Sequence, residues 1–166
     1  MRRLLPFAAT AVALACGEAQ DSRDDAGVVR FDSASVRIHT SRGDTRLLVE
    51  LARTREQRTM GLMERASIPD SGGMLFLFER DERADAGFWM YRTRIPLDIA
   101  FIDSTGLIVA VRQMQPCRAT LARGCPAYEP GVPYRAALEV NAGVLARNGI
   151  APGSRIELPV TGAEGR

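Results

Sequence analysis

The sequence contains no lysine: all 22 of its basic residues are arginine, in a chain of 166 residues. Without lysine the chain has no P-loop lysine for a phosphate, no Schiff-base lysine and no serine–lysine dyad. Histidine and cysteine are scarce as well, with one histidine, His39, and three cysteines. This set cannot build a three-histidine or a four-cysteine zinc site, and it offers one histidine as a general base. We therefore expect no metal site and no cofactor.

The first 15 residues have the features of a secretory signal. Two arginines precede an uncharged run over residues 4–15, which is shorter than the roughly 20 residues that a membrane-crossing helix needs. The run ends in ALAC at 13–16, which is similar to a bacterial lipobox, although alanine stands where leucine is commoner. We expect residues 1–15 to be removed and Cys16 to carry lipid, which anchors the exported protein on the periplasmic or extracytoplasmic side of a membrane. A plain signal peptide with an incidental cysteine is the alternative.

The expected mature chain has no excess of positive charge. Loss of residues 1–15 removes two of the 22 arginines and leaves 20 against 20 acidic residues. Because nucleic-acid binding relies on clustered positive charge, we expect no nucleic-acid partner. Residues 16–34 are small and polar, and we expect a flexible tether there, followed by a single β domain over 35–162.

Cys117 and Cys125 remain once Cys16 is assigned to the lipid, and they lie eight residues apart between Pro116 and Pro126. An even number of cysteines in an exported protein favours a disulfide. A catalytic or metal-binding thiol is the alternative, but it needs a neighbouring base or a second ligand that this segment lacks. We expect the disulfide to hold a proline-rich loop in one shape.

From residue 36 onward, short runs typical of β-strands alternate with turn signals. We expect a mainly β fold, a compact antiparallel β sandwich or barrel with one or two short helices. The expected strands are 36–40, 46–51, 74–78, 88–91, 97–102, 107–113, 136–140 and 155–160. Thr54 and Gln57 have the spacing of a capping box and predict a helix that runs to about Glu64. The expected second helix and hairpin turn are 143–148, closed by Gly149, and DSTG at 103–106.

Five segments together resemble the bacterial and archaeal family known as domain of unknown function 192. The segments are RTMGLM at 58–63, GMLFLF at 73–78, FWM at 88–90, TRIPLDIAFID at 93–103 and ALEVNAG at 137–143. The resemblance extends from about residue 45 to residue 158, and the cysteine loop with Pro126 and Tyr128 also fits it. One departure is Arg92, at a position where the family often has asparagine. The resemblance implies a compact, mainly antiparallel β domain that is often exported, and it implies no activity.

Two carboxylates lie within apolar strands. Asp98 shares a face with Ala100 on the strand 97–102, and Glu139 faces away from its apolar neighbours in the run 137–140. A carboxylate in such a setting needs a charged or hydrogen-bonding partner, or its pKa rises. A structural salt bridge and a loop-pinning hydrogen bond are both open for Asp98. The arginines available for the salt bridge are Arg58, Arg92 and Arg94.

The same carboxylates leave two function classes open. Glycosidases use a pair of carboxyl groups, one of them kept protonated by an apolar setting, so Asp98 and Glu139 are candidate catalytic residues of a hydrolase. A binding module is favoured, because the sequence contains no complete catalytic set. Its candidate ligand-binding residues are Trp89, Asp98, Glu139, Arg58 and Tyr128, and the ligand is an unidentified small molecule, glycan or protein. The alternative is structural, with Trp89 in the core and Asp98 in a buried ion pair.

Two further features are interpreted as structural. His39 lies near Ser41, but no G-x-S-x-G motif accompanies them, and we expect His39 on the surface of a strand. Met60 and Met63 are three residues apart on the first helix and so face the same way. Together with Met74 they would suit copper(I), but core packing is the favoured interpretation.

Overall fold

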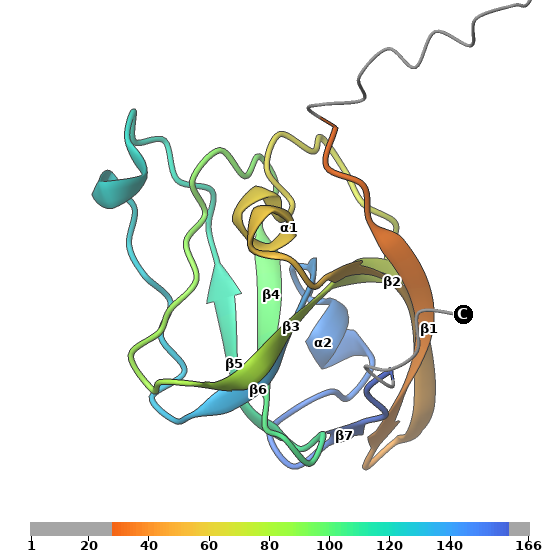
Figure 1. Ribbon diagram of the computed structural model, residues 1–166. Helices are drawn as coiled ribbons and strands as arrows, with labels where there is room; N and C mark the ends of the chain where they lie inside the picture. Colours follow the sequence, from red (N-terminus) through yellow and green to blue (C-terminus); the bar gives the residue numbers. More distant parts are fainter. Residues whose placement is uncertain (1–27, 160–166) are drawn as a thin grey trace, which may run out of the picture.

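Seven strands form one sheet that curls until its two edges meet (Figure 1). The structure, a computed structural model, describes residues 28–159. The strands are β1 (Asp32–Thr40), β2 (Gly43–Ala52), β3 (Gly72–Glu82), β4 (Leu97–Ile102), β5 (Ile108–Met114), β6 (Tyr134–Asn141) and β7 (Arg155–Ile156), and the helices are α1 (Arg55–Met60), a 3-10 turn (Ala122–Gly124) and α2 (Val144–Arg147). The expected signal, Cys16 and most of the expected tether lie outside the described residues. Within residues 28–159, no helix is long and apolar enough to cross a membrane.

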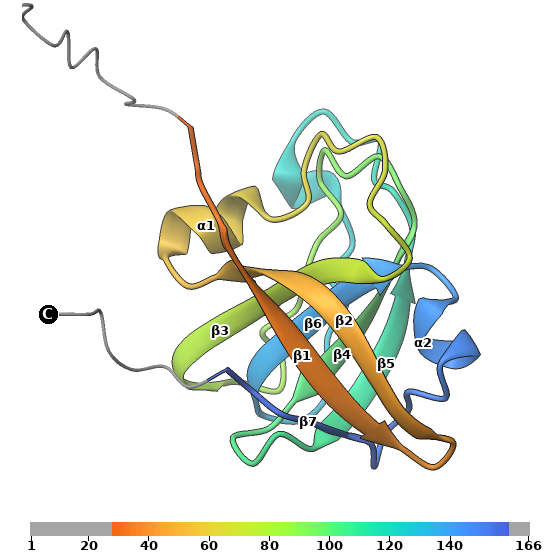
Figure 2. The same cartoon turned by 90° about the vertical axis from the view of Figure 1, so that its right-hand side faces the viewer.

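The expected mainly β architecture is confirmed, with one departure from antiparallel pairing. The sheet order is β5-β4-β6-β3-β2-β1-β7, and among the named strands β2 and β3 pair in parallel, over residues 48–52 and 72–76. The chain passes through α1 between these two strands, and a crossover of this kind is what a parallel pair requires. At the sheet edges, the Ile108 N–H donates to the Ser154 carbonyl at 2.8 Å, which joins β5 to the segment of β7 and closes the curl (Figure 2).

Alternating side chains divide the sheet into an inner and an outer apolar face. The inner face carries core residues from all seven strands and from α2. The outer face of β3, β4 and β6 carries a second core, which Leu62, Phe88 and Met90 cover. The Phe88 ring lies edge-on to the rings of Phe76 and Phe101, at 5.0 and 5.8 Å between centroids. This outer core positions the candidate site.

The α1 helix begins as its sequence predicts. The Gln57 N–H donates to Thr54 Oγ1 at 3.2 Å, and the Thr54 N–H donates to Gln57 Oε1 at 3.0 Å, which completes the capping box. The helix ends before the expected limit near Glu64, because Gly61 adopts a φ of 49° and turns the chain. The turn brings Leu62 into the outer core.

Three other local predictions are confirmed. Gly149 follows α2 with a φ of 69°, the left-handed conformation expected there. In the hairpin turn between β4 and β5, the Gly106 N–H donates to the Asp103 carbonyl at 3.1 Å. Cys117 and Cys125 form a disulfide.

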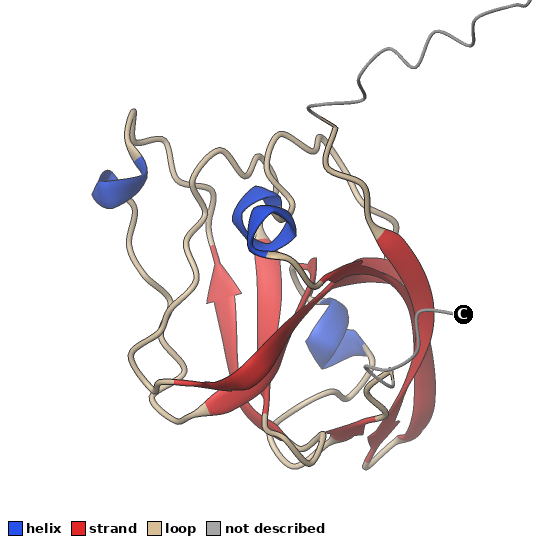
Figure 3. Ribbon diagram, viewed as in Figure 1, coloured by secondary structure: helices blue, strands red, loops and turns tan. Residues whose placement is uncertain are grey.

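The segment 88–91, expected as a strand, is part of a long connection between β3 and β4 (Figure 3). It makes isolated bridges instead of a ladder: Phe88 pairs with Tyr128, and Tyr91 pairs with Cys117. Its aromatic residues favour a strand by propensity, but no neighbouring strand runs alongside it for more than one residue. The prediction of an eighth strand here is wrong.

The N-terminal end of β1 lies beside α1 (Figure 2). Gln57 Nε2 donates to the Arg30 carbonyl at 2.7 Å. The Arg65 guanidinium binds both carboxylate oxygens of Glu50, at 2.5 and 2.6 Å, and lies 5.8 Å from the centre of the Phe31 ring. The chain therefore enters the folded part next to α1, slightly before the expected domain start at residue 35.

Candidate functional site

A small cavity lies on the outer face of the sheet, between α1 and the connection from β3 to β4. Its volume of about 30 Å³ is enough for one water-sized group. Four aromatic residues contribute to its walls: Phe76, Phe88, Trp89 and Tyr91. The wall of the cavity is about as polar as it is apolar, and its acidic residue is Glu139.

Glu139 lies in the middle of β6, paired with Met74 of β3 and Ile99 of β4. Glu139 is 4% exposed, and no hydrogen bond or ion pair joins its carboxyl to any of residues 28–159. Burial alone raises the pKa of Glu139 to about 8, from an ordinary value of 4.5. The carboxyl is therefore mostly protonated at neutral pH, and it offers the cavity a donor and an acceptor.

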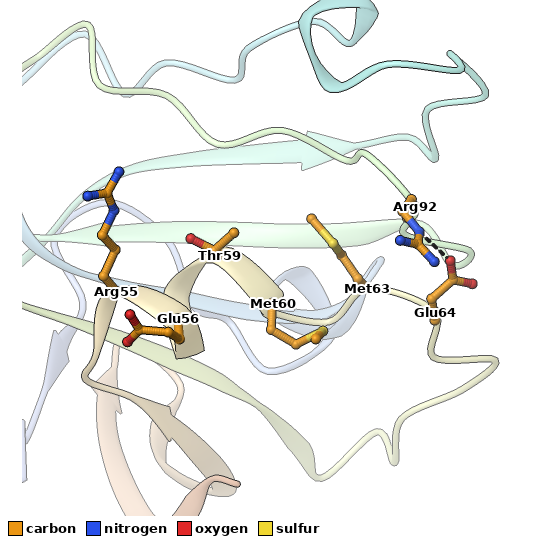
Figure 4. A pocket seen from close by; sticks show the side chains of 7 residues that line it. All are labelled: Arg55, Glu56, Thr59, Met60, Met63, Glu64 and Arg92. Atoms are coloured by element: carbon orange, nitrogen blue, oxygen red, sulfur yellow. Dashed lines mark hydrogen bonds and ion pairs between the residues drawn. The ribbon is translucent and has the colours of Figure 1, made fainter. Parts of the chain in front are cut away.

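Two open grooves adjoin the cavity. The first groove, of about 400 Å³, is lined by Met60 and Met63, with Arg55 and Glu56 at one end and Glu64 and Arg92 at the other (Figure 4). The second groove, of about 340 Å³, is bordered by Phe78, Trp89 and Tyr134. Thr59 lines the cavity and both grooves, so the three spaces adjoin one another, and together they are called the hollow below. Trp89, the single tryptophan of the chain, is 46% exposed in this hollow.

An ion-pair cluster closes one end of the first groove. Arg92 Nε donates to Glu64 Oε1 at 2.6 Å, and Arg94 Nε donates to Glu64 Oε2 at 2.8 Å. The hydrogen bonds from Arg94 and then Arg92 lower the pKa of Glu64. Glu64 and Arg92 both have left-handed backbone, with φ of 60° and 57°, which is uncommon outside glycine. The cluster holds the turn after α1 against the segment that carries Trp89.

Arg58 borders the cavity, but its guanidinium is engaged elsewhere. Its Nη1 donates to the carbonyl of Leu77 at 3.0 Å and to the carbonyl of Arg53. Its Cζ lies 5.0 Å from the centre of the Phe78 ring, in a cation–π contact. Arg58 therefore fastens α1 to β3, and it is also one of the residues that line the cavity.

Asp98 lies on the opposite face of the sheet from Glu139. The register pairs Glu139 with Ile99, so these two share a face and Asp98 points to the other one. The Asp98 carboxylate accepts hydrogen bonds from the N–H groups of Gly143 at 2.7 Å and Leu145 at 3.4 Å, at the start of α2. None of the three arginines expected as partners bonds to it among the described residues. An open groove of about 490 Å³ adjoins Asp98, whose carboxylate is already occupied by these loop-pinning bonds.

Tyr128 supports the cavity wall without lining the cavity. Its backbone exchanges hydrogen bonds of 2.7 and 3.1 Å with Phe88, and its hydroxyl accepts from the Gln115 N–H at 3.0 Å. Of the five candidate ligand-binding residues, the structure gathers three around one cavity: Arg58, Trp89 and Glu139. Asp98 and Tyr128 lie apart from it.

The two methionines of α1 and its following turn were missed as site residues. Met60 is 41% exposed and Met63 is half-buried, and both line the first groove. Core packing, expected for all three methionines, holds for Met74, which is fully buried in the outer core. Their i, i+3 spacing predicts a shared face correctly, but a short helix that ends at Gly61 leaves that face open.

His39 lies on the surface of β1, as expected. Its Nδ1 is 2.8 Å from Asp44 Oδ1, and its Nε2 is 2.9 Å from Glu157 Oε1. The hydrogen bond with Asp44 and, to a smaller extent, the one with Glu157 raise the pKa of His39. In the part of the chain that the structure describes, no group of three or more His, Cys, Asp or Glu side chains is arranged to hold a metal ion.

Residues 37–158 match the model of the family described as Uncharacterized ACR, DUF192. Two crystal structures are similar to this fold. A proposed transcription regulator from Sinorhizobium meliloti 1021 is 35% identical, with a TM-score of 0.69, and the match covers 79% of this chain and 97% of that chain. A protein of unknown function from Novosphingobium aromaticivorans DSM 12444 is 32% identical, with a TM-score of 0.68, over 76% of this chain and 85% of that chain.

None of the curated proteins matches this chain. The family match takes in the cavity, both grooves and all strands from the middle of β1 to β7. The chain therefore belongs to the DUF192 family.

Proposed function

We propose that this protein is a ligand-binding module of the cell envelope, exported and anchored by lipid at Cys16, with its site at Glu139 and Trp89. The carboxyl of Glu139 carries the proposal, because it is buried beside a cavity and has no partner within residues 28–159. Among residues 28–159 no fully enclosed side-chain oxygen lacks a hydrogen-bond partner, so the carboxyl of Glu139 keeps some contact with the solvent space of the cavity. A ligand that enters the cavity can therefore reach this carboxyl.

The dimensions of the hollow favour a ligand with a small polar head and an apolar body. The cavity of about 30 Å³ takes the head, and the grooves of about 400 and 340 Å³ take the body. Met60 and Trp89 are the large apolar side chains exposed there. Methionine adapts to ligands of irregular shape, and tryptophan offers a broad apolar face. Ligand sites commonly combine such walls with a few polar groups.

A hydrolase with paired carboxyl groups is the less favoured alternative. In glycosidases the two carboxyl groups flank one bond, about 5–9.5 Å apart. Here Asp98 and Glu139 point to opposite faces of the sheet, and Asp98 is committed to the N-terminus of α2. The geometry therefore argues against a joint acid/base role for these two residues.

The regulatory role proposed for the Sinorhizobium meliloti protein is not extended to this chain. Binding to DNA relies on clustered, available positive charge. In the described structure many arginines are paired with carboxylates: Arg65, Arg83, Arg92, Arg94, Arg135 and Arg147. The balance of charge favours a small ligand over a nucleic acid.

Because Trp89 is the only tryptophan, its fluorescence reports directly on the site. The purified protein is titrated with a panel of alkyl amines, alcohols and amides and of monosaccharides. We expect a saturable change of Trp89 emission with at least one class, and a loss of that change in Met60→Ser, which removes one exposed wall of the first groove. If every compound leaves the emission unchanged, the cavity is not a ligand site.

The anchor is tested separately by metabolic labelling with a palmitate analogue. We expect the parent protein to be labelled and Cys16→Ala to remain unlabelled. Equal labelling of the two proteins would contradict lipid attachment at Cys16, and it would leave the binding site untouched.

A further inference from the structure

We infer that the head of the ligand is a primary ammonium group, which enters the cavity and pairs with Glu139. This inference rests on the proposed function and names the chemistry of its ligand. It follows from the size of the cavity, the nature of its walls and the charges that surround it.

The size of the cavity selects a small head. A volume of about 30 Å³ admits a group the size of one water molecule, and an ammonium group is of that size. A sugar ring or a trimethylammonium group is larger and needs the walls to move apart. The alkyl chain behind the head then lies in a groove, against Met60 or Trp89.

The walls select a cation over a neutral or anionic head. Four aromatic residues line the cavity, and the face of an aromatic ring carries partial negative charge that attracts a cation within about 6 Å. An anionic head gains nothing from the partial negative charge of ring faces, and it can only accept a hydrogen bond from the protonated carboxyl of Glu139. A neutral hydroxyl makes hydrogen bonds but gains nothing from the rings.

The charged groups packed around Glu139 leave its carboxyl free for such a partner. On α1, Arg58 is bound to backbone carbonyls and to the Phe78 ring. In the turn after α1 and in the facing connection, Glu64 and Arg92 are bound to each other. The paired neighbours on β3 and β4 are apolar, and burial is the one cause of the raised pKa of Glu139. The described residues therefore supply no cationic partner for the carboxyl of Glu139, and an ammonium group of the ligand can take that place.

The pairing moves one proton. When the ammonium enters, Glu139 releases its proton to solvent, and the carboxylate binds the cation, so the two charges neutralise each other. With a folded pKa of about 8, roughly 0.9 proton is released per ligand bound at pH 7. A neutral head releases none, so the number of protons identifies the head group.

The test compares n-hexylamine with hexan-1-ol and hexanoate, which share its alkyl chain and differ in the head. Binding is followed by Trp89 emission and by calorimetry at pH 7 in two buffers of different ionisation enthalpy. We expect hexylamine to bind at least tenfold more tightly than hexanol, hexanoate to bind least, and hexylamine alone to release a proton. Nα-acetyl-lysine methylamide carries the same ammonium head on a lysine side chain. Tighter binding of this compound than of hexylamine indicates a lysine side chain as the natural source, and tighter binding of hexylamine indicates a free amine.

Variants place the effect on one residue. Glu139→Gln is expected to weaken hexylamine at least tenfold, to abolish proton release and to leave hexanol unchanged. Glu79→Gln removes the same charge from an exposed position on β3 and is expected to change the affinity for hexylamine less than twofold. Proton counting on the parent protein decides the question even where a variant folds poorly.

The outcomes separate the inference from the proposed function. If hexanol binds as tightly as hexylamine, or the amine binds without proton release, the ammonium inference is overturned and the binding module stands. If no hexyl compound changes Trp89 emission, both are overturned.

Discussion

Replacing Glu139 by glutamine should stabilise the protein, and the gain should depend on pH. The unfolded carboxyl has a pKa of 4.5 and the folded one a pKa of about 8. Because the folded pKa is raised, the unfolded chain loses its proton first, so stability falls as the pH rises from about 4.5 to about 8. The loss amounts to about 3 kcal/mol at pH 7 and about 4 kcal/mol at pH 8. Glutamine has the same shape and never ionises, so Glu139→Gln escapes this loss.

Urea unfolding of both proteins at pH 4.5, 7 and 8, followed by Trp89 emission, measures the difference. We expect nearly equal free energies of unfolding at pH 4.5 and a widening advantage for Glu139→Gln above it. Glu79→Gln, exposed on β3, should show no such pH-dependent gain. A Glu139→Gln protein that is less stable than its parent at pH 8 would refute the reasoning, because it would mean that the ionised carboxyl has a stabilising partner.

Three further changes test other parts of the structure by the free energy of unfolding at pH 7. Asp98→Asn should lose about 2 kcal/mol, since the carboxylate accepts two N–H groups at the start of α2; an unchanged value would contradict its pinning role. The double variant Cys117→Ser, Cys125→Ser should lose about 2–3 kcal/mol. The control is the parent protein with its disulfide reduced, which should lose the same amount. Arg92→Asn should leave the free energy of unfolding almost unchanged, because asparagine tolerates the left-handed backbone and this gain offsets the loss of the exposed ion pair with Glu64; a clear loss of stability would show that the ion pair outweighs the backbone effect.

Local chemistry made parts of the fold predictable from the sequence. The capping box at Thr54 and Gln57, the turn at Asp103 and the left-handed Gly149 each depend on residues close together in the chain. The parallel pairing of β2 and β3 was missed, although a helix between two strands is the usual sign of a crossover. The aromatic residues of the segment 88–91 favour a strand by propensity, whereas the segments that it pairs with in space lie outside the named strands.

The candidate site was predictable only in part, because its geometry depends on register. The alternation along each strand shows which neighbours share a face with Asp98 and which share a face with Glu139. Whether the two carboxylates share a face of the sheet depends on the register between β4 and β6, in which Ile99 pairs with Glu139. A register shifted by one residue would put both carboxylates on one face. The exposure of Met60 depends in turn on where α1 ends and on what covers it. Neither the strand register nor the element that covers α1 can be predicted from residues close together in the sequence.

The entry of the chain beside α1 bears on where the hollow can work in the cell. Arg30 and Phe31 contact the α1 region, which also borders the first groove. With lipid on Cys16, the eleven residues 17–27 reach at most about 40 Å when fully extended. The opening of the groove would then stay within about that distance of the bilayer. Alkyl amines are amphiphilic and accumulate at the membrane surface, so their local concentration at the groove would exceed their bulk concentration.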